Sequence, residues 1–224
     1  MKTLASAIAL TAAAALTATS AHAGSTAKTY YLNGYGGLAK SHTIEYSDVD
    51  ITATATAYDP KTKKTYDHNV YVGQYSNGMG VTNNVYRTKR GLRSTDGSHT
   101  VDGKGYDDTL WLSFSKPFEI TGAMFTYVSR RYEDVKIVDG YGDTLGYYDL
   151  SKLAYRSGYA YLDLTDLGYT GDKIGFTAYG NHDSWKVKGV KGHAVPTPSA
   201  AAAGLIGLIG LAARRRRNAE DSEG

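Results

Sequence analysis

Five acidic or imidazole side chains lie close together in one glycine-rich stretch. They are Asp96, His99, Asp102, Asp107 and Asp108, all within thirteen positions. Carboxylate oxygens from a loop are the hard ligands that Ca²⁺ prefers, so the aspartates form a candidate calcium site, although no twelve-residue EF-hand pattern is present. That candidate site consists of Asp96, Asp102, Asp107 and Asp108. The alternative is that aspartates beside glycines form turns, with Asp107 at the start of the next strand.

A basic stretch begins just before this cluster, and it consists of Tyr86, Arg87, Lys89, Arg90 and Arg93. Arginine beside tyrosine can contact acidic polysaccharide or lipid headgroups through charge-assisted hydrogen bonds and stacking. The candidate ligand-binding residues are Tyr86, Arg87, Arg90 and Arg93. The alternative is a solvated loop whose charges are balanced by nearby acids.

Tyrosine is unusually frequent, with 20 among 224 residues. Aromatic faces stack on sugar rings while the hydroxyls bond to sugar oxygens, so some tyrosines are candidates for a glycan-binding face. These are Tyr141, Tyr147, Tyr148, Tyr155, Tyr159 and Tyr161. The alternative is that tyrosine simply suits a half-exposed strand.

Signals for catalysis are few. The chain has no Gly-x-Ser-x-Gly elbow and no His-Glu-x-x-His pair. Its histidines His99, His182 and His193 are separated in sequence. Glu119 and Glu133 form a carboxylate pair for glycoside hydrolysis only if the fold sets them at a suitable distance. We therefore expect a protein without catalytic activity.

The N-terminus predicts export. Lys2 precedes an apolar run over 4–16, which is followed by small residues at Ala21 and Ala23, where signal peptidase requires them. We expect residues 1–23 to be a secretory signal peptide. The absence of cysteine excludes disulfides, so an exported body must depend on core packing or bound ions.

The C-terminus predicts a membrane helix. Fourteen residues without charge, 200–213, are followed by Arg214, Arg215, Arg216 and Arg217. At 1.5 Å per residue they span about 21 Å, short of a hydrocarbon core of about 30 Å, so we expect the helix to include Ser199 and cover 199–213. The arginines keep the tail, 218–224, in the cytoplasm. A GPI signal is excluded by the charged end, and a buried amphipathic helix by the lack of a polar face. A permanent anchor remains open.

The order of features at this end carries a resemblance. Val195, Pro196, Thr197 and Pro198 precede the short apolar span and the arginine cluster. The arrangement resembles the PEP-CTERM sorting signal of bacterial surface proteins, with Thr197 where glutamate is usual. The resemblance implies that 195–217 is a sorting signal, that exosortase cleaves near the tetrapeptide, and that the product reaches the cell surface, often alongside exopolysaccharide.

The body between these ends, 24–194, reads as strands. Small or apolar residues alternate with polar ones over 49–58, which predicts a strand with one buried face, and a turn follows at 59–61. We expect 66–75 to return as its hairpin partner. Further expected strands are 28–32, 40–46, 110–114, 118–128, 134–138, 145–150, 159–164, 173–179 and 185–190. This pattern predicts an all-β, antiparallel β-sandwich, most simply a jelly roll.

The segment 76–108 shows no alternation and contains six glycines, so we expect a long functional or disordered loop. Parts of the body nevertheless resemble the ectodomain of exosortase-dependent surface proteins. The matching stretches are 75–81, 98–102, 107–114 and 183–190. The resemblance implies a sandwich-type surface protein of unspecified biochemical activity.

These observations predict an exported, exosortase-processed cell-surface or extracellular-matrix protein without catalytic activity. The alternative is a lectin-like module that binds exopolysaccharide. The expected partners are signal peptidase, exosortase and the membrane. Once the two ends are set aside, the charges of the body nearly balance, which argues against a nucleic-acid partner.

Overall fold

The computed structural model describes residues 26–83, 85–89, 91–94, 99–129, 133–155 and 157–196, with 85–87 described by their backbone alone. Several predicted features lie outside these residues. They are the signal peptide 1–23 with Ala21 and Ala23, Arg90, Asp96, Thr197, Pro198, the helix 199–213, Arg214 to Arg217 and the tail 218–224. Within the described ranges, no helix is both long and apolar enough to cross a membrane.

The described chain is all-β, as expected, and its strand pairings are antiparallel. The first eight strands are β1 (Lys28–Tyr31), β2 (Gly37–Ala39), β3 (His42–Glu45), β4 (Asp50–Asp59), β5 (Lys64–Tyr66), β6 (Tyr71–Tyr75), β7 (Gly78–Thr82) and β8 (Val85–Thr88). The other eight are β9 (Gly91–Ser94), β10 (Val101–Asp102), β11 (Asp107–Thr126), β12 (Asp134–Asp139), β13 (Thr144–Asp149), β14 (Tyr159–Asp163), β15 (Thr170–Thr177) and β16 (Ser184–Ala194). Two 3-10 turns, η1 (Leu150–Lys152) and η2 (Thr165–Leu167), flank β14.

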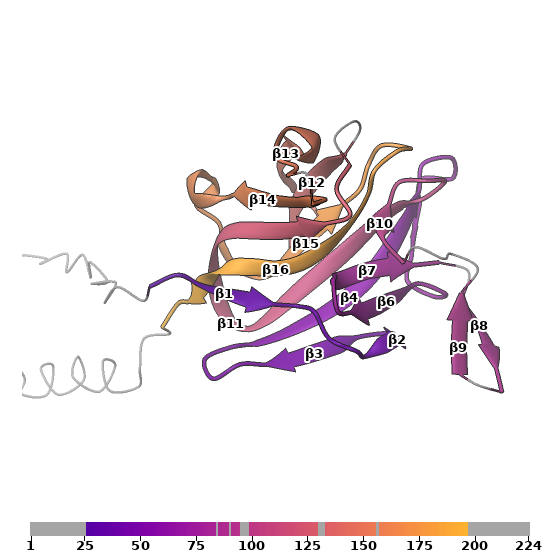
Figure 1. Cartoon of the computed structure of the whole chain (residues 1–224), viewed down its shortest axis with the longest axis horizontal. Coiled ribbons are helices and arrows are strands. Elements are labelled where there is room, and N and C mark those ends of the chain that lie inside the picture. The colour runs from indigo at the N-terminus through magenta and orange to yellow at the C-terminus, as the bar shows by residue number, and fades with distance from the viewer. Residues whose placement is uncertain are drawn as a thin grey trace, which may run out of the picture.

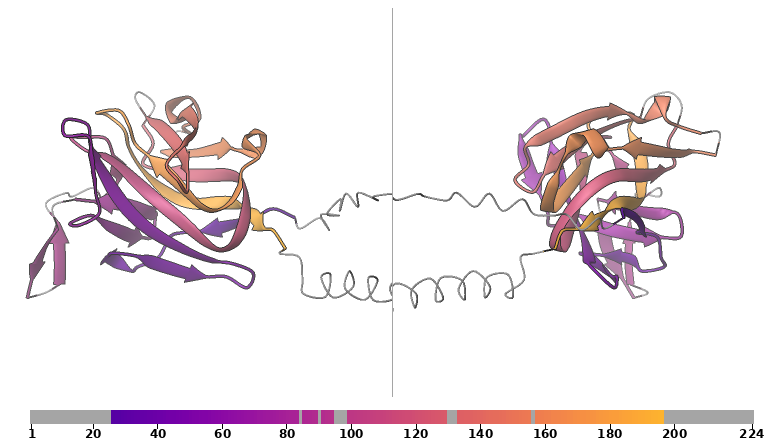
Figure 2. Two further views of the ribbon diagram at one scale, coloured as in Figure 1. Left: turned by 180° about the vertical axis from the view of Figure 1, so that it is seen from behind. Right: turned by 90° about the vertical axis from the view of Figure 1, so that its left-hand side faces the viewer.

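The long strand β11 joins two layers of sheet (Figures 1 and 2). Its first half pairs with β4 and β15, and its second half pairs with β16 and β14. The first layer continues from β15 to β12 and β13, and carries β3 and β5 beyond β4. In the second layer, β1, β7 and β10 share the far edge of β16, and β6 and β2 follow β7.

The bend in β11 corrects one expectation. The sequence predicts two separate strands over 110–114 and 118–128, whereas the chain forms one strand with a register shift between Ser113 and Phe118. Pro117 lies in the exposed bend, where its missing N–H costs no ladder hydrogen bond. The proline that separates the two predicted strands in the sequence therefore marks the corner between the two layers.

The expected hairpin of 49–58 with 66–75 is mostly wrong. Only the short strand β5 pairs with β4, while β6 pairs with β2 and β7. Asn69, between β5 and β6, has a φ of 47°, which no extended strand accommodates. The predicted face over β4 is confirmed, because Ile51, Ala53, Ala55 and Ala57 are buried and their neighbours are not.

The expectation of a long loop over 76–108 is also wrong. The segment contains β7, β8, β9 and β10. All residues of β7 are buried, and a strand covered on both faces shows no alternation. A Cβ on Gly80 would lie 1.9 Å from the carbonyl oxygen of His99, so this glycine permits a close approach of two backbones.

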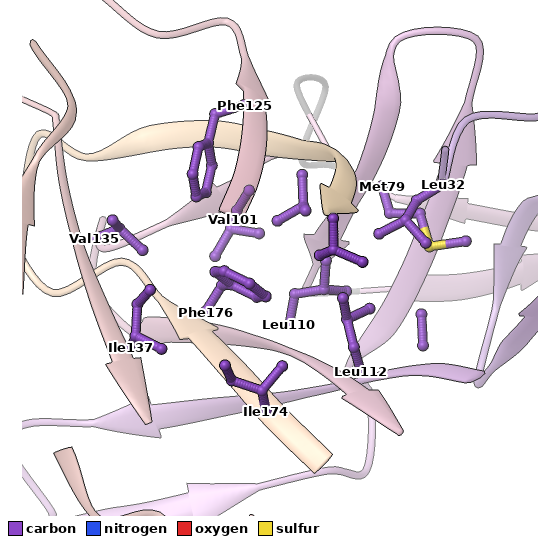
Figure 3. Packing of buried hydrophobic residues seen from close by; sticks show 14 of the residues in the cluster. Leu32, Met79, Val101, Leu110, Leu112, Phe125, Val135, Ile137, Ile174 and Phe176 are labelled. Atoms are coloured by element: carbon purple, nitrogen blue, oxygen red, sulfur yellow. The ribbon is translucent and has the colours of Figure 1, made fainter. Parts of the chain in front are cut away.

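The core fills the space between the layers. Trp185 and Phe125 are fully buried, and their rings meet edge to face with centroids 5.2 Å apart. Figure 3 shows side chains from both halves of β11 and from the strands beside them converging on this space. They include Leu110, Leu112, Phe125, Val135, Ile137, Ile174 and Phe176.

Several tyrosines lie against glycines. A Cβ on Gly73 would come within 2.6 Å of the Tyr75 ring, and one on Gly122 within 2.4 Å of the Tyr161 hydroxyl. The same arrangement joins Gly146 to Tyr148 and Gly171 to Tyr169. The abundance of both residue types thus reflects, in part, tyrosine rings packed across glycine backbones.

The body has two distinct ends. At the entry–exit end, Lys28 of β1 pairs with Gly192 of β16, and Phe118 at the bend pairs with Ala194. Figure 1 shows β1 beside the end of β16 there. At the opposite, distal end, Asp107 at the start of β11 pairs with Tyr58.

Candidate functional site

The predicted calcium ligands that the structure describes do not converge. Asp107 and Asp108 are consecutive strand residues, so their side chains point to opposite faces of the sheet. The Oδ1 of Asp108 accepts a hydrogen bond from Asn83, and the Oδ1 of Asp102 accepts one from the Lys104 backbone in a turn. No group of three or more His, Cys, Asp or Glu side chains in the described ranges is arranged to hold a metal ion.

The predicted basic loop is a β-hairpin. Strands β8 and β9 pair with each other only, and the hairpin projects from the body (Figure 1). Its backbone register places Tyr86 opposite Arg93 and Arg87 opposite Leu92. The side chains of Lys89 and Arg93 are exposed, whereas those of Tyr86, Arg87 and Arg90 lie outside the described part of the chain. Ser94 fixes the base of the hairpin by donating a hydrogen bond to the carbonyl of Asn83.

The six candidate glycan-binding tyrosines do not share one face. Tyr141 lies at the turn between β12 and β13 and is 96% exposed, and Tyr147 packs against Tyr179 in the first layer. Tyr148 packs on Gly146. Tyr159 and Tyr161, by contrast, alternate with buried residues on the outward face of β14, in the second layer.

Tyr159 belongs to a cluster of rings and lysines on that outward face. We define the tyrosine–lysine face as Tyr75, Tyr127, Tyr159, Lys186 and Lys188. Strand β16 supplies both lysines, and the residues that alternate with them, Trp185 and Val187, are buried in the core. The pairing of β11 with β14 and with β16 places Tyr159 and Lys186 on either side of Thr126.

Lys186 lies between two rings. Its Nζ is 4.6 Å from the centroid of Tyr75 and 5.0 Å from that of Tyr127, and the side chain is only 4% exposed. Cation–π attraction is strongest where water is excluded, so these rings compensate part of the cost of burying the charge. Asn77 donates a hydrogen bond to the Tyr127 hydroxyl at 2.5 Å, and His99 stacks on Tyr75.

Lys188 completes the face on the side of β14. Its Nζ lies 4.5 Å from the centroid of Tyr159, and Tyr159 is partly open to solvent. The face therefore presents the half-buried ammonium group of Lys188 beside phenol rings, whereas Lys186 is buried between Tyr75 and Tyr127. Anionic sugars can pair with such cations while their ring C–H groups stack on the aromatic faces.

One signal for this face is present in the sequence, although neither lysine is among the ligand-binding residues predicted from it. Over 184–190 the chain reads Ser-Trp-Lys-Val-Lys-Gly-Val, in which lysines alternate with apolar residues. Period-2 alternation predicts that the lysines share the outward face of the strand. The rings beside them come from β6, from the end of β11 and from β14, and the sequence alone does not indicate that proximity.

Glu119 and Glu133 do not form the carboxylate pair considered for glycoside hydrolysis. Glu119 lies beside His193 of β16 at 3.6 Å, while Glu133 accepts a hydrogen bond from the backbone of Ser184 at the other end of that strand. Nine residues of strand separate these points by about 30 Å. Glycosidase carboxylates are about 5–10 Å apart.

Glu133 itself has an unusual environment. It is 4% exposed and lines a cavity of about 230 Å³ with Asp134, Asp149 and Asp183. Burial raises the pKa of the Glu133 carboxyl to about 6; the backbone N–H groups of Ser184 and Ser129 offset part of this increase, and the charge of Asp183 adds to it. Asp183 accepts hydrogen bonds from the backbones of Asp134, Tyr179 and Gly180, so it fixes the loops around this cavity.

Comparison with known proteins gives no family assignment. No model of a known protein family matches this chain, and no curated protein matches it in sequence.

Proposed function

We propose that the chain is an exported, exosortase-processed cell-surface or extracellular-matrix protein without catalytic activity. In this proposal, residues 1–23 are a signal peptide and 24–194 are a jelly-roll-like β-sandwich ectodomain. Residues 195–217 are a PEP-CTERM-like sorting signal whose helix, 199–213, spans the inner membrane before exosortase cleavage. The tail, 218–224, stays in the cytoplasm until then.

The position of the two ends of the body supports this proposal. Lys28 pairs with Gly192, and the backbone N–H of Val195 donates a hydrogen bond to the carbonyl of Pro117 at the bend of β11. The chain therefore enters and leaves the body at the same end. A body attached to a membrane or a surface through 195–198 would hold its distal end away from the attachment point.

Mass spectrometry of the mature product from its host tests the processing. We expect the first residue to be Gly24 and the last to lie near the tetrapeptide 195–198, with no peptide containing Arg214 to Arg217 in the extracellular pool. In cells that lack exosortase, the arginine peptides should remain in the membrane fraction. Intact arginine peptides in the extracellular product of normal cells would contradict the proposal.

A second candidate function is glycan binding, and the tyrosine–lysine face favours it. In this function the face holds an acidic exopolysaccharide along β16. Lys188 pairs with a carboxylate of the polymer, and Tyr159 stacks on the adjacent sugar ring. Lys188 makes no ion pair with a described residue, and it is half-buried with its ammonium group against the ring of the partly exposed Tyr159.

Binding of the exported protein to a panel of acidic and neutral polysaccharides tests this function. Replacing Lys188 with alanine is expected to weaken binding to an acidic polymer about tenfold, because it removes a cation from a partly desolvated site. The loss should shrink at high salt, where exposed charges are screened. Lys61→Ala is the matched control, since Lys61 is an exposed lysine in the turn after β4. Equal binding by the two variants, or no binding to any polymer, rules the function out.

A further inference from the structure

A cavity of about 270 Å³ lies at the distal end of the body, and none of its described lining residues belongs to the tyrosine–lysine face. Its floor is formed by Ala57 and Val70, which are buried. Ala57 pairs with Tyr66 in β5 and with Asp108 in β11, so the cavity opens where the first layer ends. Its volume is near the lower limit of about 300 Å³ for small-molecule sites, and therefore suits one ring rather than a chain of rings.

Three aromatic rings form the wall of the cavity. The ring of Tyr66 is 5.4 Å from that of His68 and 6.2 Å from that of Tyr106, centroid to centroid, and it is nearly perpendicular to both. Tyr106 is 39% exposed, so part of its ring is open to a ligand. Aromatic rings whose faces border a cavity favour ligands with a flat array of C–H groups.

Two side-chain amides line the same cavity. Asn83 lines the cavity, and its Nδ2 donates to the Oδ1 of Asp108 at 2.8 Å, which fixes the orientation of the amide. Asn69 also lines the cavity and has a φ of 47°. Asparagine tolerates this left-handed conformation, and here it places an exposed amide at the rim.

The charge of the lining limits the ligand. The described residues around this cavity include no Asp, Glu, Lys or Arg. A charged ligand would lose hydration on entry without gaining an ionic partner among these described lining residues, and an anion would also approach the Asp108 carboxylate that accepts from Asn83. Amides, phenols and an imidazole instead match the hydroxyl groups of a neutral molecule, because each can donate or accept.

We propose that this cavity binds a single neutral pyranose, such as the terminal sugar of a surface glycan. One C–H face of the sugar stacks on Tyr106, and its hydroxyl groups bond to the exposed amide of Asn69 at the rim. This site is separate from the tyrosine–lysine face and does not depend on it. It adds recognition of an uncharged chain end to a body whose other candidate site suits an acidic polymer.

Saturation-transfer NMR on the full exported protein tests the proposal, with methyl glycosides of glucose, galactose, mannose and N-acetylglucosamine as the probes. On irradiation of the aromatic protons, we expect transfer to the ring C–H protons of at least one neutral glycoside, with a Kd in the millimolar range. Glucuronate should bind at least tenfold more weakly. Absence of transfer at about 20 mM for all four glycosides, or equal binding of glucuronate, overturns the proposal.

Variants locate the binding. Tyr106→Ala is expected to weaken binding of the neutral glycoside at least fivefold, whereas Tyr141→Ala, at an exposed tyrosine outside this cavity, should leave it unchanged. Asn69→Gly removes an amide at a position whose backbone suits glycine, so it tests the cavity without disturbing the fold. We expect at least a threefold loss. Lys188→Ala should have no effect on this binding. Wild-type affinity in both Tyr106→Ala and Asn69→Gly contradicts the proposed site.

Discussion

Replacing Trp185 with alanine is expected to lower the free energy of unfolding by about 3–5 kcal/mol, the range typical of removing a buried tryptophan side chain. Trp185 is fully buried between the layers, where it meets the ring of Phe125. Its Nε1 also donates a hydrogen bond to the carbonyl of Asp134 at 3.1 Å, which ties β16 to the start of β12. Urea unfolding followed by far-ultraviolet circular dichroism measures the loss.

Two other variants separate the contributions of Trp185. Trp185→Phe keeps an aromatic contact with Phe125 but leaves the Asp134 carbonyl without this donor, so about 1–3 kcal/mol should be lost. Trp111→Ala removes the same side chain from the outward face of the first layer, where it is only half-buried. We expect it to cost less than half as much as Trp185→Ala. Equal losses at the two tryptophans would show that the core between the layers is not the main source of stability.

The Glu133 carboxyl should make the protein less stable as the pH rises from 4.5 to about 6. Its pKa in the folded protein is about 6, against an ordinary value of 4.5, so the folded protein holds the proton more tightly than the unfolded chain does. The stabilisation is complete below pH 4.5 and is lost above pH 6. A difference of 1.5 in pKa corresponds to about 2 kcal/mol.

Comparison of the wild type with Glu133→Gln isolates this effect, because glutamine does not titrate. We expect the unfolding free energy of the wild type, relative to that of the variant, to fall by about 1.5 kcal/mol between pH 4.5 and pH 6.5. For Asp48→Asn, the unfolding free energy of the wild type relative to the variant should instead rise with pH, over a lower pH range. Burial acts to raise the pKa of Asp48, but the Tyr30 hydroxyl and Lys28 outweigh it and hold this pKa below its ordinary value. A flat difference curve for Glu133→Gln would contradict the prediction.

The sequence predicts strands well where one face is buried and the other is not. The small side chains of β4 alternate with threonines, and the range predicted from that alternation agrees with the observed strand to within a residue. Strand β7 has no such pattern because both of its faces are covered, so its sequence resembles that of a loop. The expected partner of β4 fails for another reason, since Asn69 breaks the strand through its backbone conformation. Local sequence patterns reveal neither the burial of both faces of β7 nor the backbone conformation of Asn69.

The candidate sites show the same limit. The lysines of β16 share one face by their spacing alone, but the rings beside them belong to other parts of the chain, represented by Tyr75 and Tyr159. The distal cavity combines three parts of the chain, represented by Tyr66, Asn83 and Tyr106. Their proximity depends on strand pairing, which the sequence does not specify. Only the alternation in β16 is recognisable from the sequence.

The last strand of the body lies at the centre of the second layer. Strand β16 pairs with β11 on one edge and with β1, β7 and β10 on the other. The ribosome makes a chain from its N-terminus, so β16 becomes available after all of its partners. The second layer cannot close until residue 194 is available to pair, and the folding of this layer therefore follows synthesis of the body instead of accompanying it. During that interval the edges of β1 and β11 are exposed, and unpaired strand edges of this kind are prone to aggregation.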